Sequence, residues 1–152
     1  MRQEIYSERG TADSMIEIYF TVPGDVQPKQ RPRFTKTGHT YTPKKTQDYE
    51  RKVKNCYLME YPTGIAFKDE PVELILNVYF QIPKSVSKKK REELLVYHYP
   101  TKRPDSDNLL KSIADALNGV AYTDDSQIVH AVVNKIWSEK SAAEITIREA
   151  KK

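Results

Sequence analysis

One segment constrains the fold more than any other: residues 71–83, with the sequence PVELILNVYFQIP. Apolar side chains recur at every second position, which is the period of a β-strand. The members of this row are Val72, Leu74, Leu76, Val78, Phe80 and Ile82. Ile75 and Tyr79 add apolar bulk on the opposite face. A strand that is apolar on both faces needs packing on each side, so we expect it near the centre of a sheet.

Three further segments show a strand-like pattern. Residues 15–24 alternate apolar and polar side chains, and residues 128–138 and 143–150 form two more strands joined by a short turn. Residues 28–41 are polar and contain a Lys-Thr-Gly-His turn around Gly38. This polar stretch is therefore expected to be either a hairpin or a long loop.

Three helices are expected between and after these strands. The first begins with Thr42 as its N-cap and Pro43 in the first helical position. The second is short, is capped by Ser85 or Ser87, and ends before a proline. The third covers about residues 106–118 and ends at an Asn-Gly pair, which is a typical C-terminal stop.

The order of these elements predicts the fold class. Strands that meet in antiparallel pairs, with helices between them, are typical of a two-layer α+β domain. We expect a mixed, mostly antiparallel sheet with the helices packed on one side. A chain of 152 residues has the size of one domain. We assign residues 15–152 to that domain and residues 1–14, which carry no regular pattern, to a mobile N-terminal extension.

Composition narrows the classes of function. The net charge is +4, which favours a polyanionic partner. Cys56 is the only cysteine, which excludes an intrachain disulfide and a cysteine-rich zinc site. His39, His98 and His130 lack the spacing of zinc ligands. No apolar run reaches membrane-spanning length, so we expect a cytoplasmic protein with no membrane partner.

Residues 103–127, RPDSDNLLKSIADALNGVAYTDDSQ, contain five aspartates. Two residues apart on a helix, Asp105 and Asp107 would point in different directions. Pro104 disfavours helix in the residue before it, so Asp105 lies at or just before the N-cap, where the pair can face a common point. Aspartate at a helix N-terminus is also common for purely structural reasons. Both interpretations stay open.

Asp124 and Asp125 lie in the turn before the next strand, where acidic residues are ordinary. Asp125 can join the pair of Asp105 and Asp107 only under one condition. The strand that follows Asp125 must enter the sheet next to the strand that ends at Asp105. Carboxylates that meet repel one another unless a cation joins them, and hard oxygen ligands suit Mg²⁺ or Mn²⁺. A metal site and a structural role both remain possible from the residues alone.

Lys111 shares a helix face with two aspartates at four-residue steps, Asp107 and Asp115. One interpretation is an ion pair along the helix, worth about 0.2–0.5 kcal/mol. The other is a cation that contacts a phosphate or orients a water molecule beside the acidic site.

The stretch RPDSDNLLKSIADALNGVAYTDDSQIV resembles the signature of the RusA-type Holliday junction resolvases, which are small phage and prophage endodeoxyribonucleases. Its Asp-x-Asp-Asn-Leu-x-Lys, Asp-Ala-Leu and Asp-Asp-x-Gln motifs carry the resemblance. Residues 18–34 are similar to the first strand and basic loop of that family. The resemblance covers about residues 15–149.

This resemblance implies a homodimer that binds branched DNA, in particular four-way junctions. Such an enzyme introduces paired symmetric nicks with Mg²⁺, for which Mn²⁺ can substitute, in DNA recombination and repair. The implied catalytic residues are Asp105, Asp107, Lys111 and Asp125. The implied metal ligands are Asp105, Asp107, Asp125 and Asp124.

A cluster of carboxylates repels DNA, so cationic surface must surround it. The candidate DNA-binding residues are Lys29, Arg31, Arg33, Lys36, Lys44, Lys45, Lys102 and Arg103. Phe34 and Tyr41 are available to stack on exposed bases.

Two other functions compete with the nuclease hypothesis. In a non-catalytic DNA-structure-binding protein, the aspartates would only cap a helix and shape a turn. A Mg²⁺-dependent nucleotide hydrolase would have the carboxylates, but the sequence lacks a glycine-rich loop to hold phosphates.

Overall fold

The computed structural model describes residues 3–5 and 15–152. Its main sheet has five strands in the order β1-β2-β7-β5-β6. The strands are β1 (Gln3–Ile5), β2 (Met15–Pro23), β5 (Val72–Gln81), β6 (Ile128–Ser138) and β7 (Ala142–Glu149). All neighbouring strands are antiparallel except β5 and β6, which run parallel. The expected mixed, mostly antiparallel sheet is confirmed.

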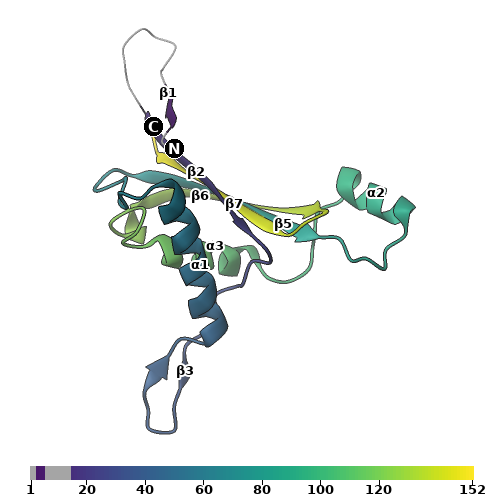
Figure 1. The fold of residues 1–152 in the computed structure, drawn as a ribbon, viewed down its shortest axis with the longest axis horizontal. Coiled ribbons are helices and arrows are strands. Elements are labelled where there is room, and N and C mark those ends of the chain that lie inside the picture. Colours follow the sequence, from purple (N-terminus) through teal and green to yellow (C-terminus); the bar gives the residue numbers. More distant parts are fainter. Residues whose placement is uncertain (1–2, 6–14) are drawn as a thin grey trace.

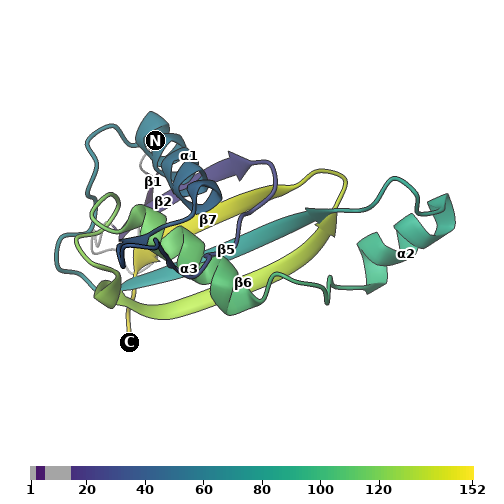
Figure 2. The same cartoon turned by 90° about the horizontal axis from the view of Figure 1, so that it is seen from below.

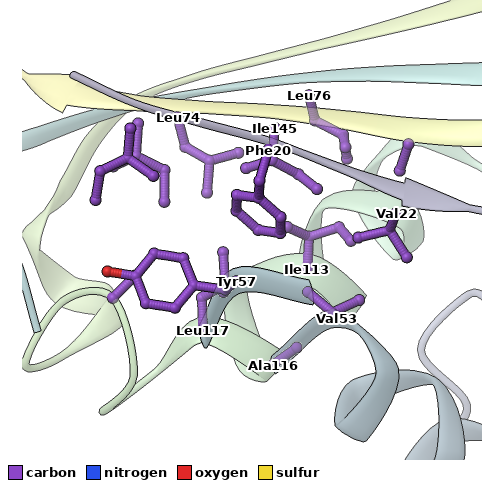
Figure 3. Close-up of a cluster of buried hydrophobic side chains, with 14 of the residues drawn as sticks. Phe20, Val22, Val53, Tyr57, Leu74, Leu76, Ile113, Ala116, Leu117 and Ile145 are labelled. Carbon is purple, nitrogen blue, oxygen red and sulfur yellow. The ribbon is translucent and has the colours of Figure 1, made fainter. Parts of the chain in front are cut away.

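Strand β5 has the internal position that its alternating pattern predicts. It pairs with β7 on one side and with β6 on the other. Val72, Leu74, Leu76 and Val78 are buried. Their side chains point to the face that the helices cover, as Figure 3 shows for Leu74 and Leu76.

Two helices form the second layer: α1 (Lys44–Glu60) and α3 (Ser106–Leu117). Both lie on the same face of the sheet (Figures 1 and 2). Val53 and Tyr57 of α1, with Ile113 and Leu117 of α3, pack against the strands in one buried cluster (Figure 3). The predicted two-layer α+β architecture is therefore confirmed.

The start of α1 differs from the prediction by one residue. Thr42 is not its N-cap: the cap is Pro43, whose backbone is extended (φ −55, ψ 144), and helix begins at Lys44. The first helical hydrogen bond runs from the Gln47 N–H to the Pro43 carbonyl oxygen at 3.1 Å. The Gln47 side chain donates to the Thr42 carbonyl oxygen at 2.7 Å, so glutamine rather than threonine secures this end.

The second helix, α2 (Lys88–Tyr97), lies apart from the two layers and contains no buried residue (Figures 1 and 2). Of its two candidate caps, Ser87 is the one used: its side chain accepts a hydrogen bond from the Lys90 N–H at 3.2 Å. The expectation of helices packed on one side holds for α1 and α3 and does not extend to α2.

The polar stretch around Gly38 forms a hairpin. Its strands are β3 (Arg33–Phe34) and β4 (Thr40–Tyr41), and they pair antiparallel in a separate two-stranded sheet. The hairpin projects from the helical layer away from the main sheet (Figure 1). Of the alternatives that the sequence left open, the hairpin is the one observed.

The N-terminal segment is described only in part. Residues 3–5 form β1 and pair with residues 15–17 of β2 at the edge of the sheet. The remainder of the mobile extension predicted for residues 1–14 lies outside the described residues. Among the helices in the described ranges, none is both long and apolar enough to cross a membrane.

The face of the sheet opposite the helices carries a polar network around Glu144. Its carboxylate accepts hydrogen bonds from Tyr19 (2.8 Å), Tyr79 (3.0 Å) and Asn77 (3.1 Å). Partial burial acts to raise the pKa of Glu144, but these hydrogen bonds outweigh it and the pKa lies below its usual value.

Candidate active site

Asp105 and Asp107 stand at the N-terminal end of α3, where the sequence predicts them. Asp105 is the N-cap residue with extended backbone (φ −69, ψ 149), and Asp107 lies in the first turn. The chain reaches this point through a cis Arg103–Pro104 peptide bond. The Asp105 side chain makes no capping hydrogen bond, and both aspartates are exposed. Their carboxylate oxygens are therefore available to a ligand.

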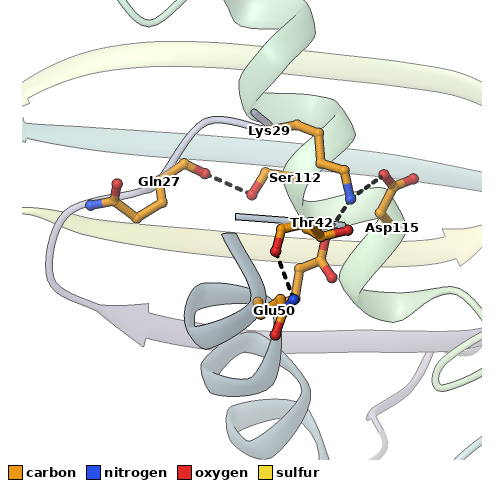
Figure 4. A network of polar contacts seen from close by, with 7 residues as sticks. Gln27, Lys29, Thr42, Glu50, Ser112 and Asp115 are labelled. Carbon is orange, nitrogen blue, oxygen red and sulfur yellow. Dashed lines mark hydrogen bonds and ion pairs between the residues drawn. The ribbon is translucent and has the colours of Figure 1, made fainter. Parts of the chain in front are cut away.

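The buried face of α3 fixes the direction of this acidic end. Leu109, Ile113 and Leu117 are fully buried against the sheet. Ser112 is also buried, and its hydroxyl donates to the Gln27 carbonyl oxygen at 2.7 Å (Figure 4). Because apolar residues hold one face of the helix in the core, Asp107 must face outward.

Asp115 is engaged in a half-buried ion-pair network. Lys29 Nζ lies 3.0 Å from Asp115 and 2.6 Å from Glu50, so a single ammonium links α3 to α1 (Figure 4). Burial acts to lower the pKa of Lys29, but the two carboxylates outweigh this and raise it. Lys29, a predicted DNA-binding residue, thus makes a structural contact between two helices. No sequence pattern predicts this contact.

Lys111 is free of the helix ion pair that was its ordinary interpretation. It is exposed, and within residues 15–152 its ammonium takes part in no ion pair or hydrogen bond. Asp115, one turn further along, pairs with Lys29 instead. An unpaired ammonium one turn after Asp107 is positioned to meet an anionic ligand at this end of the helix.

The turn after α3 holds Asp124 in a structural role. Asp124 caps the short 3-10 helix η1 (Asp125–Gln127), where its side chain accepts a hydrogen bond from the Ser126 N–H at 3.0 Å. A hydrogen bond from the Ser126 side chain, together with the one from its N–H, lowers the pKa of Asp124. Asp125 is exposed and, within the described ranges, its carboxylate has no hydrogen-bond or ion-pair partner.

Gln127 fixes the same turn, and sequence reasoning gave it no role. Its side-chain oxygen accepts from the Asp124 N–H at 2.9 Å. Its amide nitrogen donates to the carbonyl oxygens of Glu70 at 3.0 Å and Phe67 at 3.3 Å. The signal that could have identified it is the capping-box spacing of an aspartate followed three residues later by a glutamine.

The structure does not bring Asp125 to Asp105 and Asp107 within one chain. Asp125 precedes β6, whose first residue pairs with Val72 at the start of β5. Pro104, beside Asp105, lines a hollow with Val78 and other residues near the end of β5. Asp125 thus lies near the start of β5 and Asp105 near its end. Strand β5 has 10 residues and is about 33 Å long, and α3 has 12 residues and is about 18 Å long.

The charges around Tyr122 agree with this placement. Tyr122 is fully buried, and its hydroxyl donates to the Ala114 carbonyl oxygen at 2.6 Å. Burial raises its pKa, and the negative charges of Asp125, Asp115 and Asp124 raise it further. Asp125 therefore lies beside the later turns of α3 rather than beside its first turn.

Comparison with known proteins decides the family. The model of the family described as Endodeoxyribonuclease RusA matches residues 23–148. The chain belongs to the RusA endodeoxyribonuclease family. This confirms the resemblance seen in the sequence and the predicted enzyme class, a phosphodiester hydrolase that acts within DNA.

Two curated relatives agree with membership of the RusA family. The crossover junction endodeoxyribonuclease rusA of Lactococcus phage r1t is 32% identical over 112 residues, which cover 69% of this chain and 79% of the phage protein. The protein named "Uncharacterized protein YqaN" of Bacillus subtilis (strain 168) is 39% identical over 141 residues. That alignment covers 87% of this chain and 96% of YqaN.

Most of the predicted DNA-binding cations of this RusA family member are exposed and unpaired. Within the part of the chain that the structure describes, none of five cations near the β3–β4 hairpin forms an ion pair; they are Arg31, Arg33, Lys36, Lys44 and Lys45. Lys102 lies over aromatic rings, 5.3 Å from the centroid of Trp137 and 5.6 Å from that of Phe80. Arg103 is exposed and lines a hollow together with Asp105.

The donor set of this RusA family member fits a hard divalent cation at the N-terminus of α3. Mg²⁺ keeps several of its waters and takes one or two carboxylates from protein together with substrate phosphates. Asp105 and Asp107 offer such carboxylates on an exposed helix end. Within residues 3–5 and 15–152, no three acidic, histidine or cysteine side chains group closely enough to hold a metal alone. The four aspartates assigned as ligands therefore stay a prediction.

Proposed function

We propose that this chain is a Mg²⁺-dependent endodeoxyribonuclease that resolves four-way (Holliday) DNA junctions by paired symmetric nicks, in cytoplasmic DNA recombination and repair. One observation carries the proposal: Asp105 and Asp107 lie exposed at the start of α3 in a chain of the RusA family. The printed name of the phage relative, a crossover junction endodeoxyribonuclease, supports a branched substrate.

In this proposal the carboxylates of Asp105 and Asp107 hold the ion, with Mn²⁺ able to replace Mg²⁺. When bound, the ion supplies an acidified water and charge stabilisation for the reacting phosphate. Lys111 contacts the scissile phosphate from one turn along the same helix face, where its charge offsets that of the phosphate oxygens. Arg103, which lines a hollow together with Asp105, adds positive charge beside this site.

We propose further that the active enzyme is a homodimer in which each site takes Asp125 from the second chain. Within one chain Asp125 lies at the far end of α3 from Asp107. A two-fold arrangement allows one chain's turn to face the other chain's helix N-terminus. A four-way junction has near two-fold symmetry, and paired nicks require two sites. Asp124, in its capping role, holds Asp125 in that turn.

The test is cleavage of a synthetic four-way junction with and without Mg²⁺, by wild type and by Asp107→Asn. We expect wild type to give symmetric nicks only with the metal. The variant should lose cleavage by at least about 10²–10³-fold, as for other removed transition-state contacts. Junction binding should survive or tighten, because one negative charge is removed.

Asp48→Asn is the matched control, since it makes the same chemical change on an exposed helix carboxylate whose one ion-pair partner among the described residues is Arg51, at 3.7 Å. It should cut like wild type. If wild type binds junctions and never cuts them with Mg²⁺ or Mn²⁺, the protein is a non-catalytic DNA-structure-binding protein and the proposed nuclease activity is wrong.

A further inference from the structure

The β3–β4 hairpin exposes a large aromatic side chain far from the core. Phe34 is 74% exposed, and the hairpin projects away from the sheet (Figure 1). The ring lies in a strongly cationic segment, and sites for unpaired nucleic-acid bases combine such cationic surface with aromatic side chains. We propose that this hairpin recognises the branch point of a DNA junction, with the Phe34 ring stacked on an unpaired base. The inference rests on the proposed function, because it concerns how that site is directed to branched DNA.

The charge around the hairpin identifies the partner as a polyanion. Residues 26–47 contain six lysines and arginines and no aspartate or glutamate. Lys29 alone among them is bound to carboxylates. The other five are exposed and unpaired within the described residues, so their charge remains to be neutralised by phosphate.

The register of the hairpin separates two kinds of contact. Arg33 lies opposite Tyr41, and Phe34 lies opposite Thr40. Because successive strand residues point to opposite faces, Phe34 and Arg33 face opposite ways. One face is suited to the phosphate backbone, and the other presents an aromatic ring. Stacking of a base on an aromatic ring tolerates any base sequence, so it can detect a branch without reading its sequence.

The hairpin is tied directly to the acidic end of α3. The Lys29 N–H donates to the Asn108 carbonyl oxygen at 3.2 Å, beside the Ser112 bond to Gln27. The chain from Lys29 to Phe34 spans at most about 17 Å when fully extended. One DNA strand advances about 3.4 Å per nucleotide. Phe34 therefore lies within about 17 Å of Lys29, a distance that one DNA strand covers in about five nucleotides.

The experiment measures binding and base unstacking without cleavage. The probe is a four-way junction with 2-aminopurine at the crossover, and the reference is a linear duplex with 2-aminopurine in the same sequence context. Both are titrated in EDTA with wild type, Phe34→Ala and Phe34→Trp. The matched control is Thr40→Ala, on the same hairpin face. Phe34 is exposed, so its replacement should leave the fold unchanged, which a melting curve checks.

We expect wild type to raise the 2-aminopurine fluorescence of the junction and not that of the duplex. Phe34→Ala should abolish the rise and weaken junction binding by roughly 5- to 150-fold, the range for one lost stacking contact. Its affinity for linear duplex should stay unchanged. Phe34→Trp and Thr40→Ala should behave like wild type in junction affinity.

An equal loss of junction and duplex affinity in Phe34→Ala would overturn the inference, as would an unchanged fluorescence rise. These outcomes are distinct from failure of the proposed function. A wild type that unstacks the crossover base and never nicks with Mg²⁺ leaves the hairpin inference standing. A wild type that nicks symmetrically while Phe34→Ala keeps its fluorescence rise leaves only the proposed function.

Discussion

The two ends of α3 hold acidic side chains in opposite circumstances. At the C-terminal end, Asp115 is bound by Lys29 and Asp124 caps η1. At the N-terminal end, the carboxylates of Asp105 and Asp107 have no hydrogen-bond or ion-pair partner among the described residues. The same residue type therefore serves structure at one end and remains available for a ligand at the other. Availability, rather than acidity, separates the candidate active-site residues.

Asp125 is an exception to this difference between the two ends of α3. It lies beside the C-terminal end of α3, yet among the described residues its carboxylate is as free as those of Asp105 and Asp107. Its neighbours Asp124 and Gln127 hold the turn in place. A rigidly held turn with a free carboxylate at its tip is suited to act on something outside its own chain.

Among variants that compare the two ends of α3, Lys111→Ala is expected to have the largest effect. Its ammonium has no hydrogen-bond or ion-pair partner among the described residues, so removal should leave the melting temperature unchanged. Cleavage of the four-way junction should fall by at least about 10²-fold, because a cation that offsets charge on the phosphate is lost. Single-turnover cleavage together with a melting curve checks both parts. A large fall in melting temperature would instead assign Lys111 a structural role.

Gln127→Glu should destabilise the turn of residues 124–127, which follows the C-terminal end of α3. Two amide N–H donors are replaced by a carboxylate that faces the carbonyl oxygens of Phe67 and Glu70. Losing these two hydrogen bonds and setting a carboxylate against carbonyl oxygens should lower the free energy of unfolding by about 1–3 kcal/mol. Cleavage should fall as well, because Asp125 loses its fixed position. Urea unfolding with a parallel cleavage assay measures both.

Lys29→Met should lower the free energy of unfolding at neutral pH by about 1–2 kcal/mol, because Glu50 and Asp115 lose their shared ammonium. The pKa of Lys29 is raised in the folded protein, so its contribution is fully present below the ordinary value of 10.5 and is lost at higher pH. The difference between wild type and variant should therefore shrink above about pH 10.5. A difference that is constant across that range would contradict the ion-pair account.

The smallest effect is expected for Glu144→Gln on the open face of the sheet. The pKa of Glu144 is lowered, so its contribution is present above the ordinary value of 4.5 and disappears as the pH falls through the folded-state pKa. We expect a loss of about 0.5–1 kcal/mol at pH 7 from weakened hydrogen bonds. Urea unfolding from pH 7 to pH 3 should show the two proteins converging. Convergence on raising the pH would contradict this assignment.

The sequence predicts those parts of the fold that local patterns determine. The alternation of residues 72–82 marks an internal strand, and the apolar spacing of α3 with its Asn-Gly stop gives the bounds of that helix within one residue. The predicted start of α1 was wrong by one residue. Among the described residues the Thr42 side chain makes no capping hydrogen bond, and the extended conformation of Pro43 determines where the helix begins. The position of α2 outside the two layers also has no local signal.

The candidate site was predictable in residue type and only partly in arrangement. The position of Asp105 and Asp107 at the N-terminal end of α3 follows from Pro104 and the helix pattern. The place of Asp125 depends on strand order: β6 pairs parallel to β5 and begins at the start of that strand. The structural role of Lys29 depends on partners in two helices. No sequence pattern specifies such long-range contacts.

The central claim is that the free carboxylates at the two ends of α3 act together across two chains. Its most direct test is to co-express differently tagged Asp107→Asn and Asp125→Asn chains and to purify the heterodimer through both tags. Each parent homodimer should be inactive on a four-way junction with Mg²⁺. The heterodimer retains one site with both wild-type aspartates, so it should nick one strand of the junction. A heterodimer that binds junctions and stays as inactive as its parents would contradict the claim.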